Sequence, residues 1–152
     1  MRYPFAAIRG FVRRHRLHRA MPVDLAVIHD LYDVEYLRMP EELLGFAFAT
    51  KKTQVVKVNE RLHRFGQRMV LAHEISHLLL GHPNALYLCE VGDWWYSRIE
   101  VEAQKGAAIL LIPEKPLVEM ARRGYSVREM QDFFEVPGEL IELGLRMANR
   151  IV

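Results

Sequence analysis

The order of hydrophobic and polar residues predicts a pair of strands in the first half of the chain. Residues 45–50 and 54–59 are rich in the aromatic and β-branched residues that strands prefer. The polar segment 51–53 between them suits a connecting turn, and residues 34–39 alternate loosely ahead of them. The pattern therefore predicts a small antiparallel sheet that precedes the next helix.

Apolar residues at helical spacing predict helices on both sides of these strands. A short helix is expected within 22–32. After the sheet, the longest helical pattern covers 64–80 and is followed by a glycine and then a proline, which are typical of a helix C-terminus. A second long helix is predicted over 98–111, where Pro113 stops it, and the intervening segment 87–96 has the composition of a loop.

The C-terminal third of the chain is predicted to be entirely helical. One helix is expected over 116–123, and another opens at residues 126–129, which form the sequence of a capping box. The segment 136–138 then interrupts the pattern before a final amphipathic helix. The apolar stripe of that helix consists of Leu140, Leu143, Met147 and Ile151.

Length and composition indicate one folded domain. The chain has 152 residues, of which 51% are hydrophobic, so it can bury a substantial core. The proline-containing segment 113–116 is the one plausible boundary. We expect a basic N-terminal arm over 1–21, a core over 22–113 and a helical C-terminal subdomain over 114–152.

Two absences in the sequence narrow its cellular setting. No apolar run approaches the roughly 20 residues that span a bilayer, and the N-terminus lacks the hydrophobic stretch of a secretion signal. We therefore expect a cytoplasmic protein that does not associate with a membrane. Cys89 is the single cysteine, so an internal disulfide is excluded, and a metal site would have to use histidine and carboxylate ligands.

Positive charge is concentrated at the N-terminus. The first nineteen residues contain six arginines and no acidic residue, which leaves 15 basic and 19 acidic side chains, a net charge of −4, in the rest of the chain. The arginines are Arg2, Arg9, Arg13, Arg14, Arg16 and Arg19. Such an arm either contacts nucleic acid or an acidic partner, or forms an amphipathic helix that packs through Phe5, Ile8 and Val12. The packed helix is the commoner case, and nucleic-acid binding is left open.

The clearest chemical signature is the sequence HEISH at residues 73–77, which has the form HExxH. Residues four apart on an α-helix differ by roughly 40° around its axis, so His73 and His77 leave the same face and can bind one metal ion. Glu74 projects beside that metal, where a carboxylate can take a proton from water and pass it to a leaving amine. A histidine pair that is merely packed is the alternative, but the apolar sequence on both sides favours a hydrolytic zinc site.

Such a zinc site needs a third protein ligand, with one position left open for water. A third histidine six residues after His77 is excluded, because Pro83 occupies that position. His82 is close in sequence, but a ligand there would require the chain to double back immediately after Gly81. The third ligand is therefore expected from another element.

Two acidic residues on the predicted 98–111 helix, Glu100 and Glu102, are better candidates. The rest of the helix face that contains Glu100 is apolar apart from one glutamine, and consists of Ala103, Gln104, Ala107 and Leu111. Glu102 instead sits above Lys105 at i+3 and is expected to be solvated. A buried carboxylate is costly unless it binds a metal, so Glu100 is the predicted ligand.

With these residues in place, the chain resembles the ImmA/IrrE family of small zinc metallopeptidases. The family pattern E-x-E-A-N-x-F-A-x-x-L-L-M-P is similar to EVEAQKGAAILLIP at residues 100–113. Val58-Asn59 before the motif helix and the sequence LLLGH at 78–82 extend the resemblance, which covers residues 22–113.

Three residues depart from the family pattern. Gln104 replaces an asparagine, which is expected to alter a hydrogen bond that orients a metal-binding group. Gly106 replaces a phenylalanine, which is expected to remove core packing and weaken the helix, and Ile112 for methionine is a minor change. None of the three removes a candidate ligand or base.

The resemblance implies an α+β fold, in which a minimal zincin-like core precedes a helical, helix-turn-helix-like C-terminal part. The core would contain the small antiparallel sheet, the HExxH helix and the Glu-bearing helix. The implied function is a site-specific endopeptidase that inactivates a helix-turn-helix transcriptional repressor in phage or mobile-element induction or in a stress response. The expected zinc ligands are His73, His77 and Glu100, and Glu74 is the expected general base.

Several points are left open by the sequence. Tyr96 and His82 are both candidates for the donor that stabilises an oxyanion, and the oligomeric state is not indicated. The alternative function is a DNA- or protein-binding regulatory module with a metal site and little or no proteolysis, suggested by the basic arm and the helical C-terminus. Glu74 favours the peptidase, because a structural zinc site needs a closed set of ligands and no base.

Overall fold

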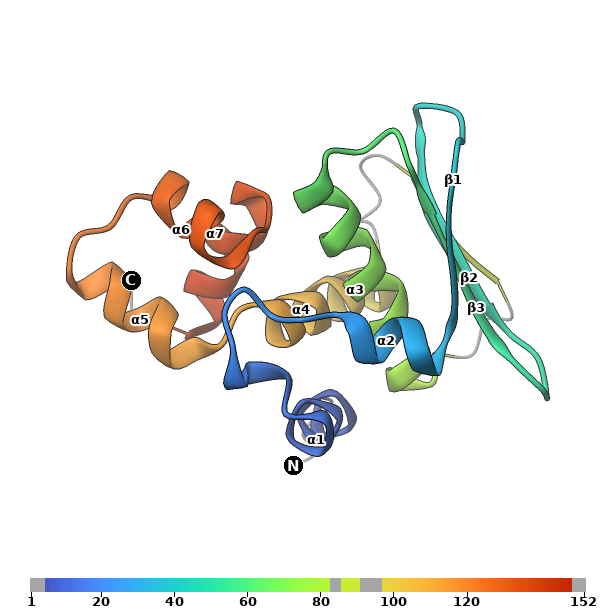
Figure 1. The fold of residues 1–152 in the computed structure, drawn as a ribbon, viewed down its shortest axis with the longest axis horizontal. Helices are drawn as coiled ribbons and strands as arrows, with labels where there is room; N and C mark the ends of the chain where they lie inside the picture. The colour runs from blue at the N-terminus through green and yellow to red at the C-terminus, as the bar shows by residue number, and fades with distance from the viewer. Residues whose placement is uncertain (1–4, 83–85, 91–96, 149–152) are drawn as a thin grey trace.

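The computed structural model describes residues 5–82, 86–90 and 97–148, with the backbone alone for 86–89. The elements in chain order are α1 (Ala6–His15), η1 (Leu17–Arg19), α2 (Ala26–Leu31), β1 (Asp33–Leu37), β2 (Leu43–Ala49), β3 (Gln54–Asn59), α3 (Arg64–Leu80), β4 (Leu86–Glu90), α4 (Arg98–Leu111), α5 (Glu114–Arg122), α6 (Val127–Phe134) and α7 (Gly138–Ala148). The sheet forms one side of the molecule, and the C-terminal helices lie at the opposite end (Figure 1). Helix α3 packs on β2 and β3, and α4 contacts both α3 and α7. The predicted α+β fold is confirmed.

In the described part of the chain, the sheet has four strands in the order β1-β3-β2-β4. Strands β2 and β3 form the predicted antiparallel pair, with Gly45 opposite Val58 and Ala49 opposite Gln54. Strand β4 pairs antiparallel with the other edge of β2. The expectation of a loop over 87–96 is thus wrong for 87–90, because a free edge of β2 recruits this segment as a strand. Residues 91–96 lie outside the described residues.

Strand β1 makes the sheet mixed rather than antiparallel throughout. It pairs with β3 in parallel, with Asp33 opposite Val55. The chain passes from β1 to β2 before it enters β3, and β3 then lies between them. The buried Asn59 holds the connecting segment: its amide nitrogen donates to the carbonyl oxygens of Pro40 at 3.0 Å and Leu43 at 2.7 Å. A hairpin between β1 and β2 is therefore excluded by the insertion of β3.

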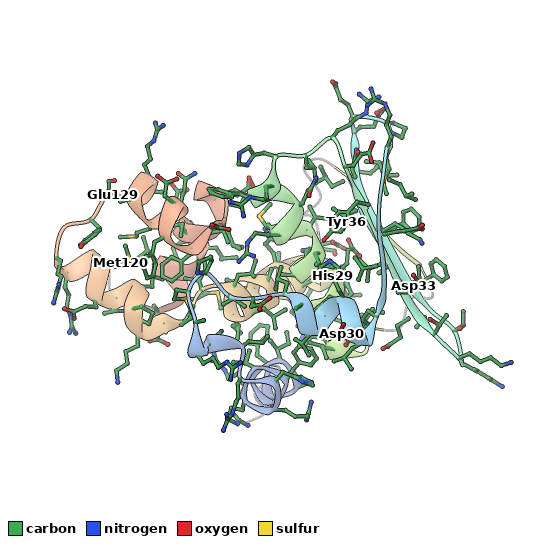
Figure 2. All side chains as sticks on the ribbon, in the orientation of Figure 1. His29, Asp30, Asp33, Tyr36, Met120 and Glu129 are labelled. Atoms are coloured by element: carbon green, nitrogen blue, oxygen red, sulfur yellow. The ribbon has the colours of Figure 1, made fainter. Side chains whose placement is uncertain are left out.

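Helix α2 is followed directly by β1, an edge strand of the sheet, and a side-chain contact joins the two elements. His29 on α2 and Tyr36 on β1 point toward each other (Figure 2), with 2.9 Å between Nε2 and the phenolic oxygen. Helix α2 begins later than the prediction within 22–32. The carboxylate of Asp24 accepts a hydrogen bond from the backbone N–H of Ala26 at 2.9 Å, which forms a local turn just before the helix, whose N-cap is Leu25.

The two long helices begin and end at the predicted residues. Helix α3 ends at Gly81, which has a φ of 67° that favours glycine. Helix α4 begins after Ser97, whose hydroxyl accepts a hydrogen bond from the backbone N–H of Glu100 at 3.2 Å. The capping box that opens α6 is also confirmed. Helix α5 begins two residues before the prediction, since Pro116 is tolerated within a first turn.

The basic arm contributes a packed helix to the core. Ile8 and Phe11 of α1 are buried, and α1 contacts α3 and α4. Phe11 is therefore buried along with Ile8, in place of the expected Val12, which is only partly buried. The described arginines of the arm are all exposed, namely Arg9, Arg13, Arg14, Arg16 and Arg19. The helix therefore has the amphipathic character expected from the sequence.

The C-terminal helices bury their apolar side chains in the same core. Leu140 and Leu143 of the predicted stripe are buried and Met147 is partly buried, while Ile151 lies outside the described residues. Helix α7 contacts α4, α5 and α6. Among the described residues, every helix is too short or too polar to span a lipid bilayer.

Gly106 lets α4 lie close against α3 and α1. A β-carbon added at Gly106 would lie 2.5 Å from Oγ of Ser76 and 2.5 Å from Cδ1 of Ile8. The expectation that glycine removes core packing at this position is therefore wrong. Ile8 and Ser76 occupy the space that a larger residue would need.

Replacing Gly106 with alanine should destabilise the fold by about 1–3 kcal/mol, because the added methyl group overpacks the contact between α3 and α4. The β-carbon of Ser76, 2.7 Å from the new atom, is attached to the α3 backbone and cannot move away alone. Urea unfolding measures the effect. Gly10→Ala in α1 is the matched control, since its nearest atom would be 3.9 Å away, and it should be neutral or stabilising. Equal free energies of unfolding for the two variants would contradict the close contact.

Candidate metal centre

The HExxH motif occupies a fully buried part of α3. The exposed fractions of His73, Glu74 and His77 are 0%, 0% and 1%. Strands β2 and β3 and helix α4 all pack on α3. The rings of His73 and His77 lie side by side, with 4.9 Å between their centroids. The helix thus presents two imidazoles on one face, in a setting that limits their movement.

Glu100 reaches both histidines from the first turn of α4. Its Oε1 lies 2.9 Å from Nε2 of His73, and its Oε2 lies 3.2 Å from Nε2 of His77. One candidate ligand atom from each of the three residues lies within 4.8 Å of the other two. The structure therefore brings together the three residues that the sequence predicts as ligands.

The pKa values of Glu100 and His77 are both shifted in this arrangement. Burial by itself would raise the pKa of Glu100, but hydrogen bonds with His73 and His77 outweigh it and lower the pKa to about 2. Burial also lowers the pKa of His77, against the opposing effect of its hydrogen bond with Glu100. An ionised carboxylate and a neutral imidazole are the forms that bind a metal ion.

Glu74 is a buried carboxylate without a protein partner among the described residues. Both of its oxygens are inaccessible to solvent and make no hydrogen bond there. Burial, and then the charge of Glu100, raise the pKa of Glu74 well above its usual value. A buried carboxyl group in this state is costly to the fold, and such groups are concentrated at functional sites.

Gln104 orients His73 from the opposite side of the ring. The Nδ1 of His73 lies 2.9 Å from Oε1 of Gln104, and an amide oxygen can only accept, so Nδ1 donates. The amide nitrogen of Gln104 lies 3.3 Å from the sulfur of Met69. Although glutamine replaces the asparagine of the family pattern, a hydrogen bond to the histidine is present. It leaves Nε2 directed toward Glu100.

Of the other residues that the sequence offered as candidates, those that the structure describes lie outside the group of three candidate ligands. Glu102 is 24% exposed and is bonded rather than simply solvated, since its Oε1 lies 3.0 Å from Nε2 of His82. His82 lies outside the group formed by the two motif histidines and Glu100. Tyr96 is outside the described residues. The sequence did not predict the pairing of His82 with Glu102. The local feature that could have suggested it is the position of the histidine directly after the glycine that ends α3.

The donor set suits zinc. Two imidazole nitrogens and one carboxylate oxygen form a ligand set of catalytic zinc sites, whereas magnesium and calcium prefer oxygen ligands alone. Glu74 directly follows His73, a histidine of the set, in the sequence, and its partnerless oxygens are those of a group that can exchange protons with a bound reactant. The residues present therefore fit a hydrolytic metal site.

The comparison with protein families agrees with this chemistry. The model of the family Peptidase_M78, described as IrrE N-terminal-like domain, matches residues 32–146, which is more than half of the chain. The match includes β1, all of α3 and α4, and most of α7. No curated protein matches the chain.

Proposed function

The chain belongs to the Peptidase_M78 family, described as IrrE N-terminal-like domain, and on this premise we propose that it is a zinc-dependent, site-specific endopeptidase. One observation carries the proposal: two buried histidines and Glu100 converge beside Glu74, a buried carboxylate without a protein partner. A structural zinc site would close its coordination with a fourth protein ligand, and it would need no such carboxylate.

The roles of the side chains follow from their positions. His73, His77 and Glu100 would hold the zinc ion, which supplies a Lewis acid that polarises the scissile carbonyl and acidifies water. Glu74 accepts a proton from water on one of its carboxylate oxygens and delivers it to the nitrogen of the leaving amine. Its raised pKa suits this task, because burial makes the carboxyl group retain a proton until the amine takes it.

The proposed substrate is a helix-turn-helix transcriptional repressor, and its cleavage would serve phage or mobile-element induction or a stress response. This part rests on the resemblance to the ImmA/IrrE family. A second contact surface is needed to select one protein, because a short peptide across a single metal offers little selectivity. The exposed arginines of α1 and η1 supply a basic surface that suits an acidic face of the repressor.

The proposal is tested by incubating the zinc-loaded protein with a candidate substrate, a small helix-turn-helix repressor sought among the proteins encoded next to it. Mass spectrometry should detect one cut, and a metal chelator should prevent it, because the ligand set is useless without its ion. An unrelated helical protein is the control and should stay intact. Cleavage of both proteins would contradict the site-specific function, and cleavage of neither would contradict the peptidase.

A further inference from the structure

His82 lies against the ring of His77 because the chain turns back at the end of α3. Gly81 has a φ of 67°, and its N–H donates to the carbonyl oxygen of Leu78 at 3.2 Å. The N–H of His82 then donates to the carbonyl oxygen of His77 at 3.3 Å. The two rings lie 5.1 Å apart between their centroids. The doubling back that the sequence argued against does occur, but it directs His82 to the Nδ1 side of His77.

A chain of three side chains extends from His77 toward the surface. The Nδ1 atoms of His77 and His82 are 2.9 Å apart, and Nε2 of His82 lies 3.0 Å from Oε1 of Glu102. The other carboxylate oxygen of Glu102 lies 3.4 Å from Nε of Arg98, which is largely exposed. The hydrogen bond with His82 is the main cause that lowers the pKa of Glu102, against a smaller effect of burial.

The positions of the protons in this hydrogen-bonded series depend on which ring nitrogen of His77 binds the metal. Its Nε2 faces Glu100, so a metal bound through Nε2 leaves the single proton of the neutral imidazole on Nδ1. That N–H donates to Nδ1 of His82, whose own proton must then be on Nε2 and donates to Glu102. Each donor thus has an acceptor, and the chain ends on a carboxylate.

We propose that His82 and Glu102 are positioning residues of the zinc site, which hold the ring and tautomer of His77 and make its Nε2 a stronger donor to the metal. The proposal rests on the proposed function, because it assumes a metal bound through His77. Removing partners of this kind typically weakens metal binding by roughly 10–100-fold, because they orient the ligand and raise its basicity. Since both ring nitrogens of His82 are engaged, neither is directed at the metal or at an oxyanion.

The two motif histidines are therefore supported unequally. His73 donates to the neutral amide of Gln104, which is buried, whereas His77 is connected through His82 to a carboxylate that is 24% exposed. The ion pair of Arg98 with Glu102 lies at the surface and should contribute little. The positioning effect is therefore expected from His82 and Glu102, and not from Arg98.

The test measures the dissociation constant of zinc by competition with a chromophoric chelator. His82→Ala should weaken zinc binding roughly 10–100-fold, and Glu102→Ala should weaken it in the same direction. His82→Gln should restore most of the affinity, because its amide oxygen can accept from His77 while its amide nitrogen donates to Glu102. In the zinc-loaded wild type, long-range proton–nitrogen NMR spectra should find the proton of His77 on Nδ1 and that of His82 on Nε2.

Matched variants separate positioning from folding. Glu119→Ala breaks an exposed i,i+4 pair with Arg123 that resembles the pair of Glu102 with Arg98 but lies on α5. Both Glu119→Ala and Arg98→Ala should bind zinc as the wild type does. Thermal unfolding of the zinc-free proteins identifies any variant that fails to fold. If His82→Ala fails to fold, Glu102→Ala still tests the proposal, because the side chain of Glu102 is partly exposed.

The possible outcomes distinguish this proposal from the proposed function. If folded His82→Ala and Glu102→Ala bind zinc within about twofold of the wild type, well below the usual effect of such partners, the positioning role is overturned and the peptidase stands. Failure of His82→Gln to restore affinity, or a proton on Nε2 of His77, also overturns it. A wild type that binds zinc with these dependencies but cleaves no protein supports positioning and overturns the peptidase. A wild type that binds no zinc overturns both.

Discussion

Replacing Glu74 with glutamine should slow cleavage of the cognate substrate by roughly 10²–10⁴-fold while zinc stays bound, because that is the usual contribution of a general base. Glutamine keeps nearly the same shape but cannot accept a proton from water. The carboxylate is buried next to the candidate ligands and has no other partner among the described residues, so its loss should act on the chemistry. The kinetic parameters kcat and KM of zinc-loaded wild type and variant check this, and the loss should appear in kcat.

The effect of Glu74→Gln on the stability of the zinc-free protein has a predictable direction, and it serves as the folding control. Burial raises the pKa of Glu74 on folding, so the carboxyl group favours the fold at acid pH and this contribution is lost as the pH rises. At neutral pH the zinc-free variant should therefore be at least as stable as the zinc-free wild type, and the difference should vanish below the ordinary pKa of glutamate. Cleavage by the variant at a near wild-type rate would rule out Glu74 as the base.

Removing any one of the three candidate ligands should have the second large effect, the loss of zinc. The purified wild type should contain about one zinc ion per chain, as a site with three protein ligands and one open position does. His73→Ala, His77→Ala and Glu100→Ala each leave only two protein ligands. Their zinc affinity should fall by more than the roughly 10–100-fold expected from an outer partner. Elemental analysis after dialysis measures the zinc that each variant retains.

Glu102→Ala is the matched control for Glu100→Ala, because both residues lie in the first turns of α4 and only Glu100 contacts both motif histidines. It should still take up zinc when zinc is supplied in excess, with the weaker affinity expected from the loss of the contact with His82. Zinc retained by Glu100→Ala and lost by Glu102→Ala would contradict the ligand assignment. Circular dichroism of the zinc-free proteins shows whether a variant has folded.

Local sequence patterns were sufficient to predict the frame of the candidate site. The bounds of α3 and α4 depend on periodicity, on a glycine at one end and on a serine cap at another, all of which act within a few residues. The shared face of His73 and His77 follows from helix geometry alone. The inward direction of Glu100 was also predictable, because the face that a helix buries is determined by the apolar residues along it.

The pairing of distant segments was not predictable in this way. Strand β1 lies parallel to β3 because β3 enters between β1 and β2, and β4 is a strand because it completes a free edge of β2. Gly106 is required by its contact with Ser76 and Ile8, from two other helices, so comparison with a family pattern misjudged its role. Each of these features depends on neighbours that are far away in the sequence.

The sequence by itself determined which helix carries the two histidines and Glu74, and which face of the later helix carries Glu100. Only the tertiary structure decided that the first turn of α4 meets the middle of α3, and that His82 turns back onto His77 and reaches Glu102. The physical reason is the range of the interactions. Helix caps and periodic faces are stabilised by residues within a few positions, whereas the distances between ligands depend on how whole helices pack and how their side chains exclude solvent.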